Sequence, residues 1–192
     1  AYDSSECLVG SEMCIRDSLY TEQDNNSLKA YPLSIEKISN ISIGVQYIYV
    51  MYSNGVLYSI NKQTSETREI TIPAIYKPLL EDHEPHVYTD QSESIWIYTY
   101  QNSLLLYKSN LTQQWEDICL NSCNDIQYNR VQRILDLGDG NVWILTSHMG
   151  LVIYNTLNKS LTNLLHNPLK PHTIASNNLN TIYRDKDGII YI

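Results

Sequence analysis

Short apolar runs separated by polar turns dominate the chain, and the clearest of them lie between residues 134 and 165. In this segment β-branched and aromatic residues gather in runs of four or five, which is the pattern of β-strands and not of an amphipathic helix. Turn-forming residues divide the runs, first at Asp139-Gly140-Asn141 and then at residues 147–150. The segment therefore predicts a four-stranded antiparallel meander, the unit from which β-propeller blades are built.

An aromatic residue between two β-branched residues returns along the chain at nearly constant spacing. It stands at Tyr49, Trp96, Trp143 and Tyr191, which are 47 or 48 residues apart. Repeats of about 40–50 residues with four strands each are typical of propellers, whereas helical repeats need apolar positions 3.6 residues apart. We predict an all-β fold, a partial β-propeller arc of four-stranded antiparallel blades, with about three full blades and two partial ones. The recurring aromatic residues are expected to pack between adjacent blades.

The repeat also predicts where each blade begins and ends. The outer strands of one blade are expected at 19–33, three full blades at 34–72, 87–120 and 130–165, and the start of a further blade at 179–192. Propellers close only with a full ring of blades, and the last residue falls inside a predicted strand. We therefore interpret the chain as a fragment of a larger protein.

Residues 1–18 do not follow the repeat. They lack the basic and apolar regions of a signal peptide, and the string CLVGSEMCIRDS resembles a translated sequencing-adaptor peptide. We interpret residues 1–18 as an artefact or a disordered segment, and we assign no role to Cys7 and Cys14.

Charge narrows the classes of partner. The formal net charge is −8 and the isoelectric point is near 5.0, which argues against a surface that binds nucleic-acid phosphates. The sequence has no run of 18 apolar residues, the length that a membrane-spanning helix needs. We expect no direct contact with nucleic acid and no membrane contact by this segment.

The third predicted blade and the connection after it resemble the two-component regulator propeller repeat. The resemblance rests on DGNVWILTSHMGLVIYN and on HNPLKPHTIASNNLNTIYRDKDGIIYI. The matching positions are Asp139-Gly140, Trp143, Thr146, Gly150-Leu151, Tyr154, Asp185 and Asp187-Gly188. The second blade keeps only Trp96 and Thr99 of this pattern, and the first keeps Gly55 and its aromatic residues.

The resemblance implies a function that fold alone does not. Such repeats form the periplasmic sensor region of hybrid two-component histidine kinases in glycan-degrading gut bacteria. By this resemblance the chain is part of the ectodomain of an inner-membrane protein that detects an oligosaccharide and forms a homodimer through the parent protein. It is then not an enzyme itself, and the kinase lies elsewhere in the parent.

Two short clusters could carry other chemistry. Asp82-His83-Glu84-Pro85-His86 places two imidazoles and two carboxylates in one connection, but no tightly spaced third soft ligand accompanies them. We interpret it as a solvated loop and predict no metal site, no cofactor and no catalytic residues. Cys119 and Cys123 form either a small disulfide or a pair of free thiols, and the spacing does not decide between them.

Ligand binding is expected where connections between blades meet the middle hairpin loops, because a rigid scaffold positions such loops. The polar or aromatic side chains there that can bond to or stack on an oligosaccharide are Tyr100, Arg130, His148 and His172. The alternatives to a sensor are a propeller-fold lyase or hydrolase, which requires an acid and base pair on this face, and a purely structural interaction propeller.

Overall fold

The structure is a computed structural model that describes residues 37–81, 83–120 and 130–192, together with the backbone of four strands between residues 8 and 31. Its strands form four four-stranded antiparallel sheets and one two-stranded sheet. The first sheet contains β1 (Leu8–Val9), β2 (Glu12–Ile15), β3 (Ser18–Glu22) and β4 (Leu28–Tyr31). The second contains β5 (Ile38–Ile43), β6 (Tyr47–Tyr52), β7 (Leu57–Asn61) and β8 (Thr67–Ile70).

The remaining sheets repeat this order. The third contains β9 (Pro85–Thr89), β10 (Ile95–Thr99), β11 (Leu105–Lys108) and β12 (Trp115–Asp117). The fourth contains β13 (Val131–Asp136), β14 (Asn141–Thr146), β15 (Leu151–Asn155) and β16 (Leu161–Leu164), and a hairpin of β17 (Tyr183–Arg184) and β18 (Ile190–Tyr191) follows. In every sheet the strands pair in chain order, so each sheet is a meander.

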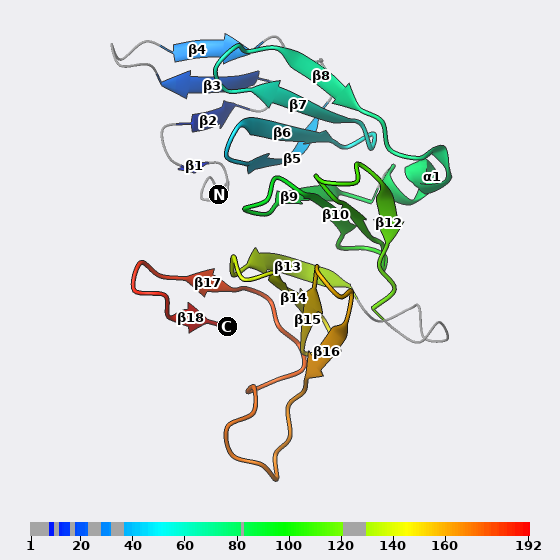
Figure 1. Ribbon diagram of the computed structural model, residues 1–192, viewed down its shortest axis with the longest axis vertical. Helices are drawn as coiled ribbons and strands as arrows, with labels where there is room; N and C mark the ends of the chain where they lie inside the picture. The colour runs from blue at the N-terminus through cyan, green and yellow to red at the C-terminus, as the bar shows by residue number, and fades with distance from the viewer. Residues whose placement is uncertain are drawn as a thin grey trace.

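The sheets follow one another around an arc, with β8, β12 and β16 towards its periphery (Figure 1). The arc is not closed, and the predicted all-β fold of a partial propeller is confirmed. The three blades that the repeat predicted within residues 34–165 correspond to the second, third and fourth sheets.

The middle strand of each blade contributes to two cores, because its side chains alternate between the two faces of the sheet. In β10, Trp96 and Tyr98 belong to a cluster shared with the fourth sheet, which contributes Ile144 and Tyr154. Ile95 and Ile97 belong instead to a cluster shared with Tyr49 and Met51 of the second sheet. All five residues of β10 are buried as a result.

Hydrogen bonds between neighbouring sheets join residues about one repeat apart. Val87 N donates to Asn40 Oδ1 and Thr89 N donates to Ser42 Oγ, both at 2.9 Å and both across 47 residues. Asp136 N donates to Tyr88 OH at 2.8 Å across 48 residues. A separation of 47 or 48 residues at two boundaries between sheets shows that successive repeats lie side by side.

Three of the four recurring aromatic residues pack against the blade or connection that follows, and Tyr191 does not. Trp96 is fully buried, and its ring centroid lies 5.7 Å from that of Tyr154 in the next blade. Tyr49 shares a core with Val87 of the next blade, and Trp143 packs against a cluster that includes Leu179 in the connection to β17. Tyr191 lies in the two-stranded sheet and is 54% exposed.

The structure contains two features that the repeat pattern did not indicate. Residues 8–9 and 12–15 lie in the segment that the sequence analysis set aside. They form β1 and β2, which pair with β3 and β4 in the first sheet. The pattern of an aromatic between β-branched residues is missing there, so the repeat gave no signal of these strands.

The connection after β8 contains a helical turn that we did not predict. A 3-10 turn at Ala74–Tyr76 leads into α1 (Lys77–Leu80), which begins with Pro78 in its first turn, where the missing amide costs nothing. Leu80 at its end is fully buried against the second and third sheets. No helix in the described part of the chain is long and apolar enough to cross a membrane.

Candidate functional site

A cluster of aromatic rings and one guanidinium group lies on the face where the middle hairpin loops emerge. It consists of His86 on β9, Tyr98 on β10, Tyr100 just after β10 and Arg133 on β13. We call these four residues the face cluster. His86 and Tyr98 are paired across β9 and β10, which places both rings on one side of the sheet.

The three rings of the face cluster are in contact. The imidazole of His86 lies at an interplanar angle of 20° to the Tyr98 ring, with 5.4 Å between centroids. Tyr100 approaches the same imidazole to 4.2 Å and meets Tyr98 edge to face at 5.9 Å. Since His86 and Tyr98 are buried and Tyr100 is half-buried, Tyr100 is the ring that reaches the surface.

Arg133 joins the cluster from the next blade. Its Nη1 donates a hydrogen bond to Tyr100 OH, and its guanidinium carbon lies 5.8 Å from the centre of the Tyr100 ring. A register shift between Val131 and Arg133 re-aims this side chain, as bulges near functional sites commonly do. Burial raises the pKa of Tyr98, and the charge of Arg133 opposes that rise. The cluster therefore presents an aromatic platform beside a cation that spans two blades.

Two of the four predicted site residues meet at Ser147. Ser147 N donates to Arg130 O at 3.0 Å, and Arg130 N donates to Ser147 Oγ at 3.3 Å. The Nδ1 atom of His148 lies 2.9 Å from the same hydroxyl oxygen. Arg130 and His148 are both exposed at one end of the fourth sheet. The structure therefore brings their backbones together on the face that carries the middle hairpin loops.

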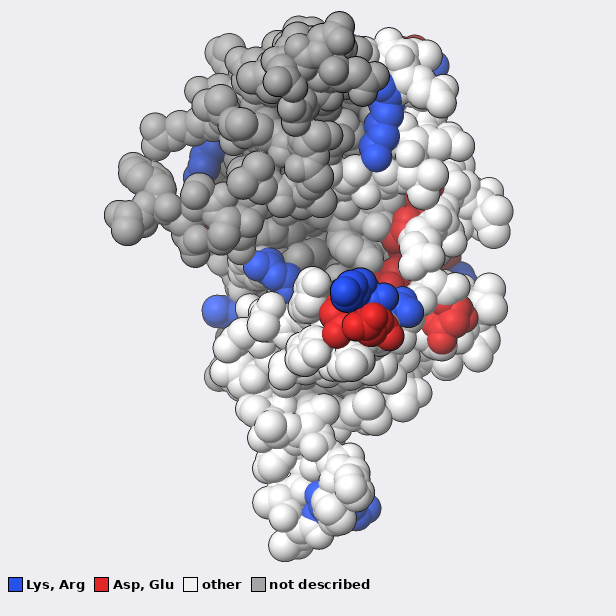
Figure 2. Space-filling view, turned by 90° about the vertical axis from the view of Figure 1, so that its left-hand side faces the viewer, with Lys and Arg blue, Asp and Glu red and all other residues white. Residues whose placement is uncertain are grey.

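His172 lies apart from this group in the connection between β16 and β17. That connection projects from the rest of the molecule in both views (Figures 1 and 2). Asn177 holds its base, because its side chain accepts a hydrogen bond from His166 N at 2.7 Å and its carbonyl oxygen accepts one from Gly150 N at 2.9 Å. His172 itself is exposed with a φ of +67°.

Sequence reasoning missed His86 and Arg133 as members of the site. His86 was considered only with His83 as a metal ligand, but His83 Nδ1 lies 2.6 Å from Glu81 O while His86 is buried among tyrosines. Among the described residues no group of three or more His, Cys, Asp or Glu side chains is placed to hold a metal ion. Asp82 lies outside the described residues.

The structure does not test whether Cys119 and Cys123 form a disulfide. Cys119 is exposed just after β12, and Cys123 lies outside the described residues. Whether the two sulfur atoms form a bridge stays a prediction.

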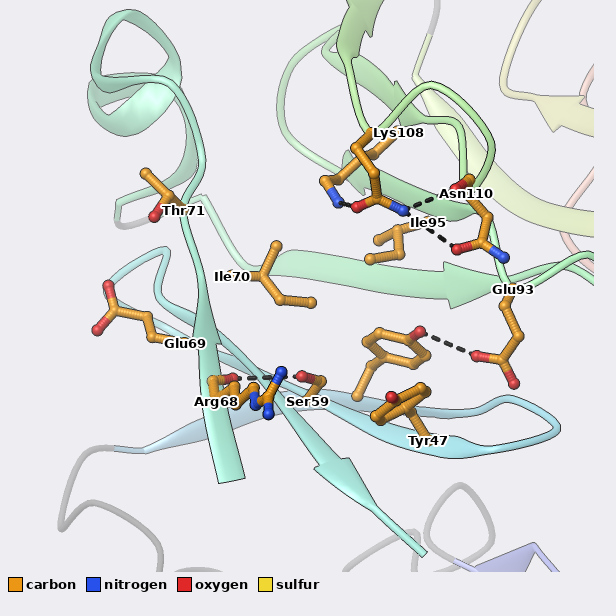
Figure 3. Close-up of a pocket in the computed structure, with 12 residues that line it drawn as sticks. Tyr47, Ser59, Arg68, Glu69, Ile70, Thr71, Glu93, Ile95, Lys108 and Asn110 are labelled. Atoms are coloured by element: carbon orange, nitrogen blue, oxygen red, sulfur yellow. Dashed lines mark hydrogen bonds between the residues drawn. The ribbon is translucent and has the colours of Figure 1, made fainter. Parts of the chain in front are cut away.

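A second hollow lies between the second and third sheets, and we call it the inter-blade groove. It has a volume of about 420 Å³ and is lined by Tyr47, Tyr49, Ser59, Arg68, Glu93 and Lys108, among others. Figure 3 shows tyrosine, serine and arginine on the wall from the second sheet and Lys108 with Asn110 on the wall from the third. Nothing in the repeat pattern marks this groove, because its residues come together only through strand register.

Comparison with known proteins supports the architecture. The scan against protein families gives no match, and no curated protein matches either. Among solved structures, the chain is similar to the extracellular domain of BT3049 from B. thetaiotaomicron, which is described as a hybrid two component system. The TM-score is 0.61 at 16% identity, and the match covers 93% of this chain and 25% of that one.

Two other solved propellers are similar over the same extent. The β-propeller domain of Cps50 (Swd1) from Myceliophteria thermophila matches with a TM-score of 0.65 at 9% identity, over 92% of this chain and 56% of that one. YCF48 bound to D1 peptide matches with a TM-score of 0.60 at 11% identity, over 92% and 55%. The chain thus spans between a quarter and somewhat over half of these proteins, and at such identities the likeness shows the propeller fold.

Proposed function

We propose that this chain is part of a ligand-binding sensor propeller, located in the periplasmic ectodomain of a hybrid two-component system, and that it detects an oligosaccharide. The face cluster is the observation that carries the proposal. Tyr100 offers a ring face for stacking on a sugar, and Arg133 and His148 offer hydrogen-bond donors for hydroxyl groups around it. The similarity to the extracellular domain of a B. thetaiotaomicron hybrid two component system supports the same class of protein.

In this proposal the chain recognises the ligand and the kinase lies elsewhere in the parent protein, which acts as a homodimer. The face cluster spans the third and fourth sheets, because Tyr100 follows β10 and Arg133 lies on β13. A ligand that contacts both residues binds more tightly to one relative placement of the two blades than to others. Such differential affinity is what lets a ligand shift a conformational equilibrium.

The test is a glycan array probed with the 192-residue chain, followed by calorimetric titration of any glycan that binds. Tyr100→Ala removes the platform and Arg133→Gln removes the cation, and each is expected to weaken binding by about tenfold or more. Tyr183→Ala serves as the control, since Tyr183 is 63% exposed on β17 and lies outside the face cluster.

Loss of affinity in both site variants with an unchanged control supports the proposal. Absence of any bound glycan, or equal binding by all four proteins, contradicts it. Release of new reducing ends from a bound glycan contradicts it in favour of a carbohydrate-active enzyme.

A further inference from the structure

The inter-blade groove forms where the facing surface of the second sheet changes from apolar to polar. One row across this sheet runs Met51, Leu57 and Ile70, and it contributes to the core between the two blades. The next row is Tyr49, Ser59 and Arg68, paired in register across β6, β7 and β8. Ser59 is small and lies between the large side chains of Tyr49 and Arg68. This row therefore leaves an open space, whereas the side chains of the apolar row fill the corresponding space.

The opposite wall comes from the third sheet, where Lys108 pairs with Ile95. The ammonium group of Lys108 donates to Gln113 Oε1, and Gln113 Nε2 donates to Asn110 O at 2.7 Å. A carbonyl oxygen can accept two hydrogen bonds, and an ammonium group can donate three. Gln113 Oε1 and Asn110 O can therefore each accept a further hydrogen bond from a ligand, and Lys108 can donate further ones. Figure 3 shows Lys108 and Asn110 across the groove from Tyr47.

The two tyrosines have different roles. Tyr49 is 5% exposed, and its hydroxyl donates to Glu93 Oε2 at 2.9 Å. Tyr47 is only half-buried, with its ring centroid 6.2 Å from that of Tyr49 and tilted by 50°. Tyr47 is therefore the ring whose face a ligand can reach.

Four charged side chains line the groove, namely the cations Arg68 and Lys108 and the carboxylates Glu69 and Glu93. Arg68 pairs with Glu66 at 2.9 Å. The Glu93 carboxylate accepts from Gln46 N at 2.6 Å as well as from Tyr49, and Glu69 is exposed. Burial lowers the pKa of Lys108, and within the described part of the chain no ion pair includes it. A half-buried ammonium with a neutral partner favours an anionic ligand.

We propose that the inter-blade groove is a second ligand site, which binds an acidic sugar unit with its carboxylate at Lys108 and its ring face on Tyr47. The sugar hydroxyls donate to the open lone pairs of Gln113 and Asn110. A groove of about 420 Å³ is within the size range of small-ligand pockets.

This site is separate from the face cluster. The groove lies at Ile95, where β10 begins, whereas Tyr98 and Tyr100 lie where it ends. Strands rise about 3.3 Å per residue, so the two sites are on the order of 15 Å apart, on opposite ends of the blade. The inference does not depend on the proposed function, and variants at either site test it separately.

The experiment is a titration of the 192-residue chain with galacturonic acid, galactose and acetate, followed by amide chemical shifts in two-dimensional NMR. Small open sites bind single sugars weakly, so we expect saturation with a dissociation constant on the order of 1 mM for galacturonic acid. Shifts are expected around residues 93–95 and 108–113. Galactose and acetate are each expected to bind at least about tenfold more weakly, because each lacks one of the two contacts.

Lys108→Gln is expected to weaken galacturonic acid binding about tenfold or more, and Tyr47→Ala about fivefold. Arg68→Gln is the matched control, since it removes the same charge from the same groove but from a side chain already paired with Glu66. It is expected to change affinity less than about twofold. An unchanged amide spectrum outside the groove confirms that each variant is folded.

Four results overturn the inference. One is the absence of saturable shifts at the groove, and another is equal binding of galactose and galacturonic acid. The third is acetate binding as tight as galacturonic acid with no effect of Tyr47→Ala, which identifies a simple anion site. Loss of binding in Tyr100→Ala alone places the sugar at the face cluster and equally contradicts the inference.

Discussion

At the scale of single residues, Asp90 and Asp185 perform the same structural task two repeats apart. Asp90 Oδ1 accepts hydrogen bonds from Ser92 N and Ser94 N, and its Oδ2 accepts one from Trp96 Nε1 at 3.1 Å. Asp185 accepts from the amides two and four residues later and from the hydroxyl of Tyr191. In each case one carboxylate fixes the turn and bonds to the recurring aromatic residue, which is fully buried at Trp96 and 54% exposed at Tyr191.

Asp90→Asn is expected to destabilise the chain by about 1–3 kcal/mol. The amide oxygen can still accept from the two backbone groups, but its NH₂ then faces the indole N–H, and neither group can accept. Asp185→Asn is the control, with an expected loss below about 1 kcal/mol, because a tyrosine hydroxyl can rotate and accept from the new amide. Urea unfolding at neutral pH measures both, and equal losses contradict this explanation.

The pH dependence of stability also depends on Asp90. Burial is the main cause that raises the pKa of this carboxyl above 3.8. A raised folded-state pKa means that protonation favours the folded chain, so this contribution is fully present below pH 3.8 and is lost as pH rises through the folded-state pKa.

The measurement is the difference in unfolding free energy between wild type and Asp90→Asn, taken from roughly pH 3 to 7. Wild type is expected to gain stability relative to the variant as pH falls through this window. A difference that is flat, or that has the opposite slope, shows that hydrogen bonding outweighs burial at Asp90.

The sequence could predict repeated residues but not residues that act through pairing. Trp96 and Trp143 were identified because their spacing is constant. Arg133 was missed because a register shift, not its position in the repeat, directs it towards Tyr100. Ser59 was missed because its neighbours Tyr49 and Arg68 lie about ten residues away on other strands. A register inferred from the two hairpin turns would have brought these three residues together.

At the scale of elements, the β14–β15 hairpin depends on one glycine. Gly150 has a φ of +66°, and a Cβ there would collide with the carbonyl oxygen of Leu164 on the neighbouring strand. Its amide also bonds to Asn177 O, and Thr146 Oγ1 donates to Gly150 O at 2.9 Å. The residue therefore joins β14, β16 and the projecting connection at one point.

Gly150→Ala is expected to destabilise the chain by more than Gly188→Ala does. Both glycines have positive φ, but a Cβ on Gly188 meets nothing nearer than 3.7 Å. Gly188→Ala thus carries only the cost of the backbone conformation, about 1–2 kcal/mol, and Gly150→Ala adds a backbone collision. Thermal unfolding of the two variants gives the comparison, and equal melting temperatures contradict it.

The elements that sequence reasoning missed share a cause. The repeat predicts strands through apolar pattern and aromatic spacing, and neither is present in residues 8–15 or in the connection at 73–86. Proline usually ends or interrupts a helix, but Pro78 is compatible with the first turn of α1. Leu80 at the end of this turn is buried against the second and third sheets, a contact that the local sequence does not indicate.

At the scale of the whole molecule, stability comes from contacts between blades as much as within them. Each middle strand supplies side chains to the cores on both of its sides, and inter-blade hydrogen bonds recur across 44 to 48 residues. Trp115 Nε1 donates to Thr71 O at 2.9 Å, and Lys159 pairs with Glu116 at 2.7 Å, so the outer strands are linked as well. Both proposed ligand sites lie at these boundaries, which is why blade placement and ligand binding are coupled in this account.

The central claim is that repeats 47 or 48 residues apart lie side by side, and nuclear Overhauser contacts between aromatic rings test it most directly. The structure predicts cross-peaks between the Trp96 indole and the Tyr154 ring, whose centroids are 5.7 Å apart, and between Tyr49 and side chains of the next blade such as Val87. Absence of these cross-peaks in a folded sample, or contacts of Trp96 only with its own repeat, would contradict the propeller arrangement and both binding sites derived from it.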